Sequence, residues 1–291
     1  MNADEHGVLL AVGPDGVRDG VLDFAAAEAS RLGTGVWLLH VIHSRVVAPT
    51  DVDQRQAIDR ALSKVGREVL TDAAGRLRDR LAGRHPVETE IATGPVAATI
   101  CDRASGAGVV ILERRDLGTV GRMLTMSVST RVAAYSHAPV VIVPRHWAAA
   151  TDERPVTVGV DHAPEASTQV EAAAAYARSV ARPLVVLHAV WLAEPYQDTV
   201  FVDHSRRDWT EEAARELRLS LAAMGEREDL RLTSDVRWAR PVDALVAASR
   251  SSSVLVLSRR DDRHAPRAHL GPVTRAVLQH AECPVLIVDR T

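Results

Sequence analysis

The amino-acid sequence predicts an α/β fold of two tandem units, each a doubly wound, five-stranded parallel sheet. Two observations carry this prediction. Short apolar blocks recur in the same order in both halves of the chain, and segments with helical spacing separate them. Self-similarity on this scale is typical of duplication. Alternation of strands and helices is typical of a parallel sheet that is covered by helices on both faces.

The apolar blocks predict the strands. Each block is a run of β-branched and aliphatic residues with little alternation, which is the pattern of a strand buried on both faces. We expect five strands in each half. Five blocks, the strand-like ones among them, match between the halves and indicate the duplication. In the first half they are Val8–Gly13, Val36–Val41, Gly94–Val96, Val109–Leu112 and Pro139–Val143. Those of the second half are Val156–Asp161, Leu184–Ala189, Arg240–Val242, Val254–Leu257 and Pro284–Val288.

The segments between the blocks predict the helices. Apolar residues recur at helical spacing over Val21–Leu32 and Ile58–Leu81 in the first half, and over Val170–Val180 in the second. In sheets of this kind, ligands bind beyond the carboxyl ends of the strands, where the strand order reverses. The residues that follow the first and fourth strands of each half are therefore the first candidates for a site.

Composition bounds the domains and the class of protein. Pro144–Pro155 is predicted to link two units that span residues 1–147 and 152–291. The net charge of −3 gives no support to a nucleic-acid surface. Apolar runs such as Val109–Leu112 are far shorter than the ~20 residues of a membrane span. The acidic N-terminus has no apolar signal core, so we expect a cytoplasmic protein. Lys64 is the only lysine and lies in a helical pattern, which excludes a Walker phosphate loop.

With these positions assigned, the chain resembles the universal stress protein family in its tandem form. The resemblance rests on Val156–Asp161 with the Ala-Pro turn after it, and on the two endings Met126–Pro144 and Gly271–Val288. It implies a universal-stress-protein-like, Rossmann-like α/β sandwich in each unit. It also implies that the last strands, Val140–Val143 and Val285–Val288, lie side by side in an internal pseudo-dimer. Apolar edge strands would otherwise be exposed templates.

Members of that family that bind ATP carry a loop of three spaced glycines followed by Ser or Thr. Glycine lets backbone N–H groups approach phosphate oxygens without a Cβ clash. In unit 1 the glycine positions and the hydroxyl position hold Glu113, Asp116, Met126 and Ser127. In unit 2 they hold Ser258, Asp261, Gly271 and Pro272. Carboxylates repel phosphates, and proline lacks an N–H. We therefore expect ATP binding in the usual mode to be lost or weakened in both units, and more certainly in unit 1.

The candidate ligand contacts follow from these positions, and neither a catalytic nor a metal-ligating residue is expected. In unit 2 the candidates are Asp161, Ala189, Ser258, Asp261, Gly271 and Thr274. In unit 1 they are Gly13, Val41, Ser127 and Ser129, with Asp15 as a substitute for the acidic residue that Gly13 replaces. His40 and His188 hold equivalent strand positions and are interpreted as duplicated structural residues, in preference to catalytic bases.

The charged segment Arg259–His269 has two interpretations. Its arginines form a phosphate-binding fork, or the segment is a solvated surface loop, which its mixed charges favour. Asp261, His264 and His269 match no established zinc pattern.

The resemblance implies a non-catalytic tandem protein of stress or dormancy response with degenerate ATP-binding loops. One alternative is an ATP or AMP sensor with a modified site in unit 2. Another is a weak ATP or adenylate hydrolase, which needs a metal-holding carboxylate such as Asp161 or Asp261. The candidate partners are an adenine nucleotide, a protein, or a second copy of the chain, with no nucleic acid and no membrane.

Overall fold

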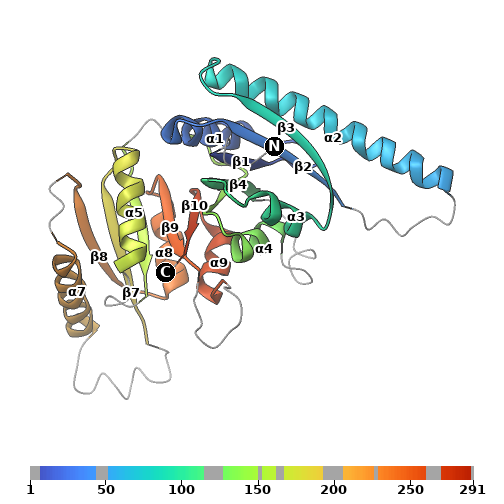
Figure 1. Ribbon diagram of the computed structural model, residues 1–291. Coiled ribbons are helices and arrows are strands. Elements are labelled where there is room, and N and C mark those ends of the chain that lie inside the picture. Colours follow the sequence, from blue (N-terminus) through green and yellow to red (C-terminus); the bar gives the residue numbers. More distant parts are fainter. Residues whose placement is uncertain are drawn as a thin grey trace. The chain divides into compact units, whose positions relative to one another are not determined.

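The computed structural model describes residues 7–43, 52–114, 127–149, 153–161, 167–192, 206–225, 229–259 and 270–289 (Figure 1). The chain divides into two compact units, Met1–Ala149 and Ala150–Thr291.

Unit 1 is a five-stranded parallel sheet with helices on both faces. Its elements are β1 (Val8–Ala11), α1 (Asp19–Leu32), β2 (Val36–His43), α2 (Val52–Leu81), β3 (Val87–Gly94), α3 (Val96–Arg103), β4 (Val109–Arg114), α4 (Val128–Tyr135) and β5 (Val140–Pro144). The strand order is β3-β2-β1-β4-β5. Helix α1 packs beside α2, and α3 packs beside α4 (Figure 1). The strand order reverses between β1 and β4, which is where sheets of this type bind ligands.

Unit 2 repeats this plan. Its elements are β6 (Val156–Val160), α5 (Ser167–Ser179), β7 (Leu184–Val190), α7 (Arg206–Ala223), β8 (Leu232–Trp238), α8 (Pro241–Ser249), β9 (Val254–Ser258), α9 (Pro272–His280) and β10 (Val285–Val288). All pairings between neighbouring strands are parallel, in the order β8-β7-β6-β9-β10. The predicted fold class is thus confirmed in both units. Pairing of Val140–Val143 with Val285–Val288 stays a prediction.

The core of each unit is aliphatic, as the scarcity of aromatic residues requires. Leu9, Leu10 and Ile111 are fully buried in the sheet of unit 1, and Leu184 and Leu255 in that of unit 2. Burial of such a side chain stabilises the fold by about 1.5–3 kcal/mol. The central strands are therefore apolar on both faces, which explains why their sequences do not alternate.

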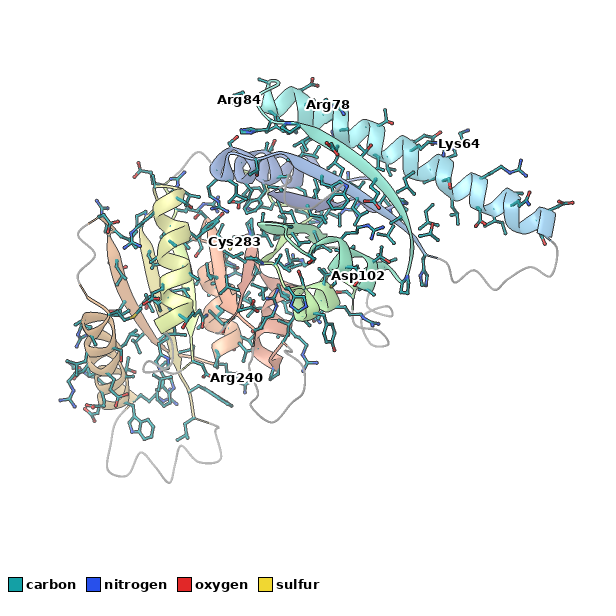
Figure 2. All side chains as sticks on the ribbon, in the orientation of Figure 1. Lys64, Arg78, Arg84, Asp102, Arg240 and Cys283 are labelled. Carbon is teal, nitrogen blue, oxygen red and sulfur yellow. The ribbon has the colours of Figure 1, made fainter. Side chains whose placement is uncertain are left out.

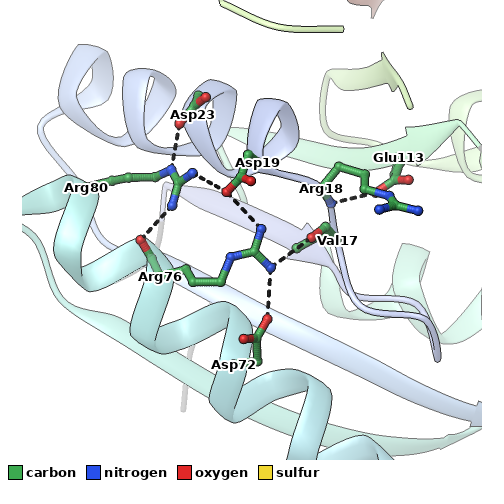
Figure 3. Close-up of polar contacts among 8 residues, drawn as sticks. All are labelled: Val17, Arg18, Asp19, Asp23, Asp72, Arg76, Arg80 and Glu113. Carbon is green, nitrogen blue, oxygen red and sulfur yellow. Dashed lines mark hydrogen bonds and ion pairs between the residues drawn. The ribbon is translucent and has the colours of Figure 1, made fainter. Parts of the chain in front are cut away.

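A network of arginines and carboxylates holds α1 against α2 (Figure 3). The Arg76 guanidinium donates to Asp19 on α1 (2.9 Å) and to Asp72 on α2 (2.8 Å). The Arg80 guanidinium donates to Asp23 (2.6 Å) and also to Asp19. These hydrogen bonds, that from Arg76 first, lower the pKa of the Asp19 carboxyl below its usual value.

The first residues after β5 pack on unit 1. The backbone N–H of Trp147 donates to the Pro144 carbonyl (3.0 Å). The Trp147 ring meets Phe24 of α1 edge-on, with 5.7 Å between the ring centroids. A Cβ on Gly20 of α1 would lie 2.0 Å from the Trp147 carbonyl oxygen. Part of the predicted linker is therefore anchored to unit 1, and it carries Arg145 to the carboxyl edge of the sheet.

Across the residues described, no helix is both long and apolar enough to span a membrane.

Candidate functional site

Unit 1 has a cavity of about 640 Å³ at the point where its strand order reverses. It opens beyond the carboxyl ends of β1, β2 and β4. The four predicted contacts Gly13, Val41, Ser127 and Ser129 all line it, together with Asp15. They are far apart in the sequence, and the parallel sheet brings them to one edge. Whether they bind a ligand stays a prediction.

Glu113 occupies the polar end of this cavity. Its carboxylate accepts a hydrogen bond from the backbone N–H of Arg18 (3.0 Å), the N-cap residue of α1. Its other oxygen lies 3.8 Å from Nε of Arg145, and its side chain is only 13% exposed. A helix N-terminus attracts anions through its backbone N–H groups. The Glu113 carboxylate is therefore an internal anion that already occupies the beginning of α1.

Ser127 is engaged as well. Its hydroxyl accepts a hydrogen bond from the Thr130 N–H (3.2 Å) and so caps α4. The same hydroxyl lies 3.0 Å from that of Ser129 and 2.8 Å from that of Thr130. This is an ordinary N-cap arrangement. The residue expected to meet a phosphate thus stabilises a helix end. Asp116 and Met126 lie outside the described residues.

His40 and His188 make the same contact in the two units. Nδ1 of His40 lies 2.9 Å from the Val12 carbonyl, and Nδ1 of His188 lies 3.1 Å from the Val160 carbonyl. A carbonyl only accepts, so Nδ1 carries the proton in both rings. Each ring ties the second strand of its unit to the carboxyl end of the first: to Val12, which follows β1, and to Val160, which ends β6. This geometry supports the interpretation of both histidines as duplicated structural residues.

Unit 2 has a smaller cavity, of about 150 Å³, at the equivalent point. It is lined by five of the predicted residues: Asp161, Ala189, Ser258, Gly271 and Thr274. Gly271 is the N-cap residue that precedes Pro272, the first residue of α9, and among the described residues no side chain caps this end of the helix. The sixth predicted residue, Asp261, lies outside the described residues.

Gln169 fills the floor of the unit 2 cavity, and sequence reasoning missed it. Its side-chain amide donates to the Gly159 carbonyl on β6 (2.6 Å) and accepts from the Ser258 hydroxyl on β9 (3.1 Å). The side chain is buried, so Gln169 bridges two strands across the switch point. A Cβ on Gly159 would lie 2.5 Å from Cδ2 of Leu245, which shows how tightly this floor packs.

Arg259 does not fit the interpretation of the charged segment as a solvated loop, and it lines the unit 2 cavity. It is 2% exposed, and its guanidinium pairs with Asp289, which follows β10. It is therefore part of the packed wall of unit 2, and the solvated-loop prediction is wrong for this residue. Arg260, Asp261, Arg263, His264, Arg267 and His269 lie outside the described residues. Over the part of the chain described, no three metal-ligating side chains gather into one group.

Lys64 points away from α2 into solvent (Figure 2), and its side chain is 74% exposed. The only lysine of the chain is not among the residues that line the unit 1 cavity.

The fold defines a protein of two tandem Rossmann-like α/β units, each with a cavity at the carboxyl ends of its strands. A sequence model of the universal stress protein family matches residues 6–144 and, again, residues 153–289. The chain belongs to the universal stress protein family and carries its domain twice.

Relatives support the same assignment over the full length. A universal stress protein of Mycolicibacterium smegmatis is 30% identical over 295 residues, which cover 99% of this chain and 98% of that protein. One of Mycobacterium tuberculosis is 23% identical over 312 residues, covering 99% of this chain and 96% of the relative.

Solved structures show the same fold. The crystal structure of a universal stress protein from Archaeoglobus fulgidus aligns with a TM-score of 0.70 at 18% identity, covering 99% of this chain and 98% of that one. A universal stress protein from Pseudomonas aeruginosa aligns with a TM-score of 0.59 at 16% identity, covering 99% and 94% of the two chains.

Proposed function

We propose that this tandem universal stress protein acts in a stress or dormancy response by binding, with no chemistry of its own, and that unit 1 does not bind ATP in the family's usual mode. We place it in the cytoplasm. One observation carries the proposal for unit 1: the Glu113 carboxylate accepts the N–H of Arg18 and faces Arg145 at the end of the cavity. A phosphate entering there would have to displace a carboxylate of the same charge, which costs electrostatic energy.

Calorimetric titration with ATP, ADP and AMP tests this proposal. The full chain and Asp161→Ala are compared, because Asp161 lines the cavity of unit 2. We expect unit 1 to provide no tight nucleotide site, so Asp161→Ala should bind none of the three nucleotides tightly. Micromolar ATP binding with two sites per chain would contradict the proposal.

A second candidate function, an adenine-nucleotide sensor in unit 2, has its own support. Five predicted contacts line one cavity, and the beginning of α9 has no side-chain cap there. The cavity is smaller than the ~300 Å³ at which small-molecule pockets usually begin. A nucleotide would therefore need Gln169 to move. Micromolar ATP or AMP binding that is lost in Asp161→Ala would establish this function.

Weak ATP or adenylate hydrolysis is the third candidate, and it needs a carboxylate-bound metal ion beside the phosphates. Asp161 is the described residue placed for that role. Phosphate release that depends on Mg²⁺ and is abolished by Asp161→Asn would favour this candidate over binding alone.

A further inference from the structure

The walls of the unit 1 cavity are mainly aliphatic. They are built by Leu39 and Ile42 of β2, Leu62 and Val65 of α2, and Val96 and Ile100 of α3. The cavity of about 640 Å³ lies in the ~300–1,000 Å³ range of small-molecule pockets. Pockets of this type take most of their affinity from apolar contact, and a few polar groups orient the ligand.

The apolar stripe of α2 changes its environment along the helix. In the C-terminal half, Leu70 and Leu77 are buried against the rest of unit 1. In the N-terminal half, Leu62 is half-buried and Val65 is 40% exposed, and both face the cavity. Figure 1 shows this half of the helix extending past the strands. An amphipathic helix normally buries its whole apolar stripe, so the stripe beside the cavity offers apolar surface for a ligand.

Three backbone N–H groups near the beginnings of α1 and α4 are engaged within the protein. The Arg18 N–H at the beginning of α1 donates to Glu113. At the beginning of α4, the N–H of Thr130 donates to the Ser127 hydroxyl and that of Arg131 to the Ser127 carbonyl. The Arg145 side chain faces Glu113, so opposite charges meet at this end of the cavity. An anionic ligand that took the place of the Glu113 carboxylate would break its contacts with the Arg18 N–H and with Arg145, whereas an uncharged ligand leaves them intact.

We propose that the unit 1 cavity binds an uncharged, largely apolar small molecule. The proposal rests on the proposed function in one respect: it assumes that unit 1 does not bind ATP in the family's usual mode, so that its cavity is open to another ligand. Apolar contact with α2 and α3 supplies the affinity, and the hydroxyl of Ser129 at the rim offers a hydrogen bond to one polar group of the ligand.

The uncharged fluorophore Nile red tests this inference on the full chain. We expect saturable binding of one equivalent per chain, with the emission moving to shorter wavelength. Val65→Arg places a charge on the apolar wall and should weaken binding at least 10-fold. Val96→Trp fills the cavity from α3 and should have a similar effect. Leu219→Arg is the matched control, because Leu219 is a 65% exposed apolar residue on α7 of unit 2, and it should leave binding unchanged.

Two results would overturn the inference: no saturable binding by the wild-type chain, or binding that both Val65→Arg and Val96→Trp leave unchanged while their thermal unfolding shows that they are folded. The proposed function fails separately. Displacement of bound Nile red by ATP in equal proportion would show that unit 1 takes nucleotide, and so would contradict the proposed function while the cavity still binds the apolar molecule. If unit 1 bound neither Nile red nor ATP, only the proposal of an apolar ligand would be contradicted.

Discussion

The two units have the same fold, but different residues lie where the strand order reverses, at the end of the fourth strand of each unit. Glu113 on β4 is in register with Val143 of β5, and Ser258 on β9 is in register with Val288 of β10. At this position unit 1 has a carboxylate that binds the beginning of α1, and unit 2 has a hydroxyl that donates to Gln169. The cavity lined by the described residues has a volume of about 640 Å³ in unit 1 and about 150 Å³ in unit 2.

This difference shows how a duplicated binding fold diverges. The elements that build the switch point are the same in both units, down to the histidine that binds the carbonyl at the end of the first strand. What changes is the side chain at the ends of the strands. In unit 1 the change sets the charge of the site and leaves its volume open. In unit 2 the Ser258 hydroxyl donates to the buried Gln169 of α5, and the cavity there is smaller.

The largest predicted effect concerns the anchor that carries Arg145 toward Glu113. Gly20→Ala would place a Cβ 2.0 Å from the Trp147 carbonyl oxygen, so the segment after β5 must shift. We expect a loss of about 3 kcal/mol in the free energy of unfolding, measured by urea denaturation. The matched control is Gly75→Ala in α2, where a Cβ meets open space. It should gain up to about 1 kcal/mol from helix propensity. Equal effects of the two variants would contradict this account.

Glu113→Ser puts the residue of unit 2 into unit 1. It removes the charge-assisted hydrogen bond to the Arg18 N–H. We expect a loss of about 2 kcal/mol in the free energy of unfolding, since hydrogen bonds to charged groups contribute about 1.5–3 kcal/mol. Glu90→Ser is the control, because Glu90 pairs with Arg103 on the surface, where such pairs contribute about 0–1 kcal/mol. A Glu113→Ser loss no larger than that of Glu90→Ser would rule out a structural role for the carboxylate.

Gln169→Ala should bring unit 2 closer to unit 1 in volume. The bridge between Gly159 and Ser258 is lost, and we expect unfolding to become easier by about 1–2 kcal/mol. If unit 2 is a nucleotide sensor, the same variant should bind AMP more tightly in calorimetry, because its floor is open. Gln56→Ala, at an exposed position on α2, should change neither quantity. Tighter binding by the wild-type chain than by Gln169→Ala would show that Gln169 is a ligand contact and does not obstruct the cavity.

The smallest predicted effect is the pH dependence of the contact between α1 and α2. The pKa of Asp19 is lowered in the folded chain by Arg76 and then Arg80. A carboxyl with a lowered pKa stabilises the fold above its unfolded pKa, and this contribution is lost as the pH falls through the folded value. Thermal unfolding of the wild type and Asp19→Asn should therefore differ slightly at pH 7 and converge below about pH 4. A difference that grows toward low pH would reverse the assigned sign.

Much of the fold could be predicted because the aliphatic runs of the strands and the apolar periodicity of the helices are local features of the sequence. Unbroken aliphatic runs such as Val109–Leu112 predict strands buried on both faces, and those strands form. The carboxyl-edge rule then placed residues such as Gly13 and Asp161 beside cavities. This rule depends only on where a strand ends, so it identifies candidate residues without knowledge of any tertiary contact.

Gln169 and Arg259 could not be found in this way. Gln169 stands next to Val170 in a helical pattern, and only the fold brings it to Ser258, which is 89 residues away in the chain. Arg259 begins a charged run that predicts a solvated surface, and its burial depends on Asp289 beyond the last strand. Polar side chains that are satisfied by distant partners leave no periodic signal in the sequence.

The central claim, that Glu113 keeps nucleotide out of unit 1, is tested most directly by fluorine NMR of the chain labelled with 5-fluorotryptophan. Trp37 and Trp147 report on unit 1, and Trp191, Trp209 and Trp238 report on unit 2, which accounts for all five tryptophans. During titration with ATP to millimolar concentration, we predict that the Trp37 and Trp147 resonances stay in place, whether or not those of unit 2 move. Trp147 is two residues after Arg145 in the chain. A saturable shift of the Trp147 resonance would contradict the claim.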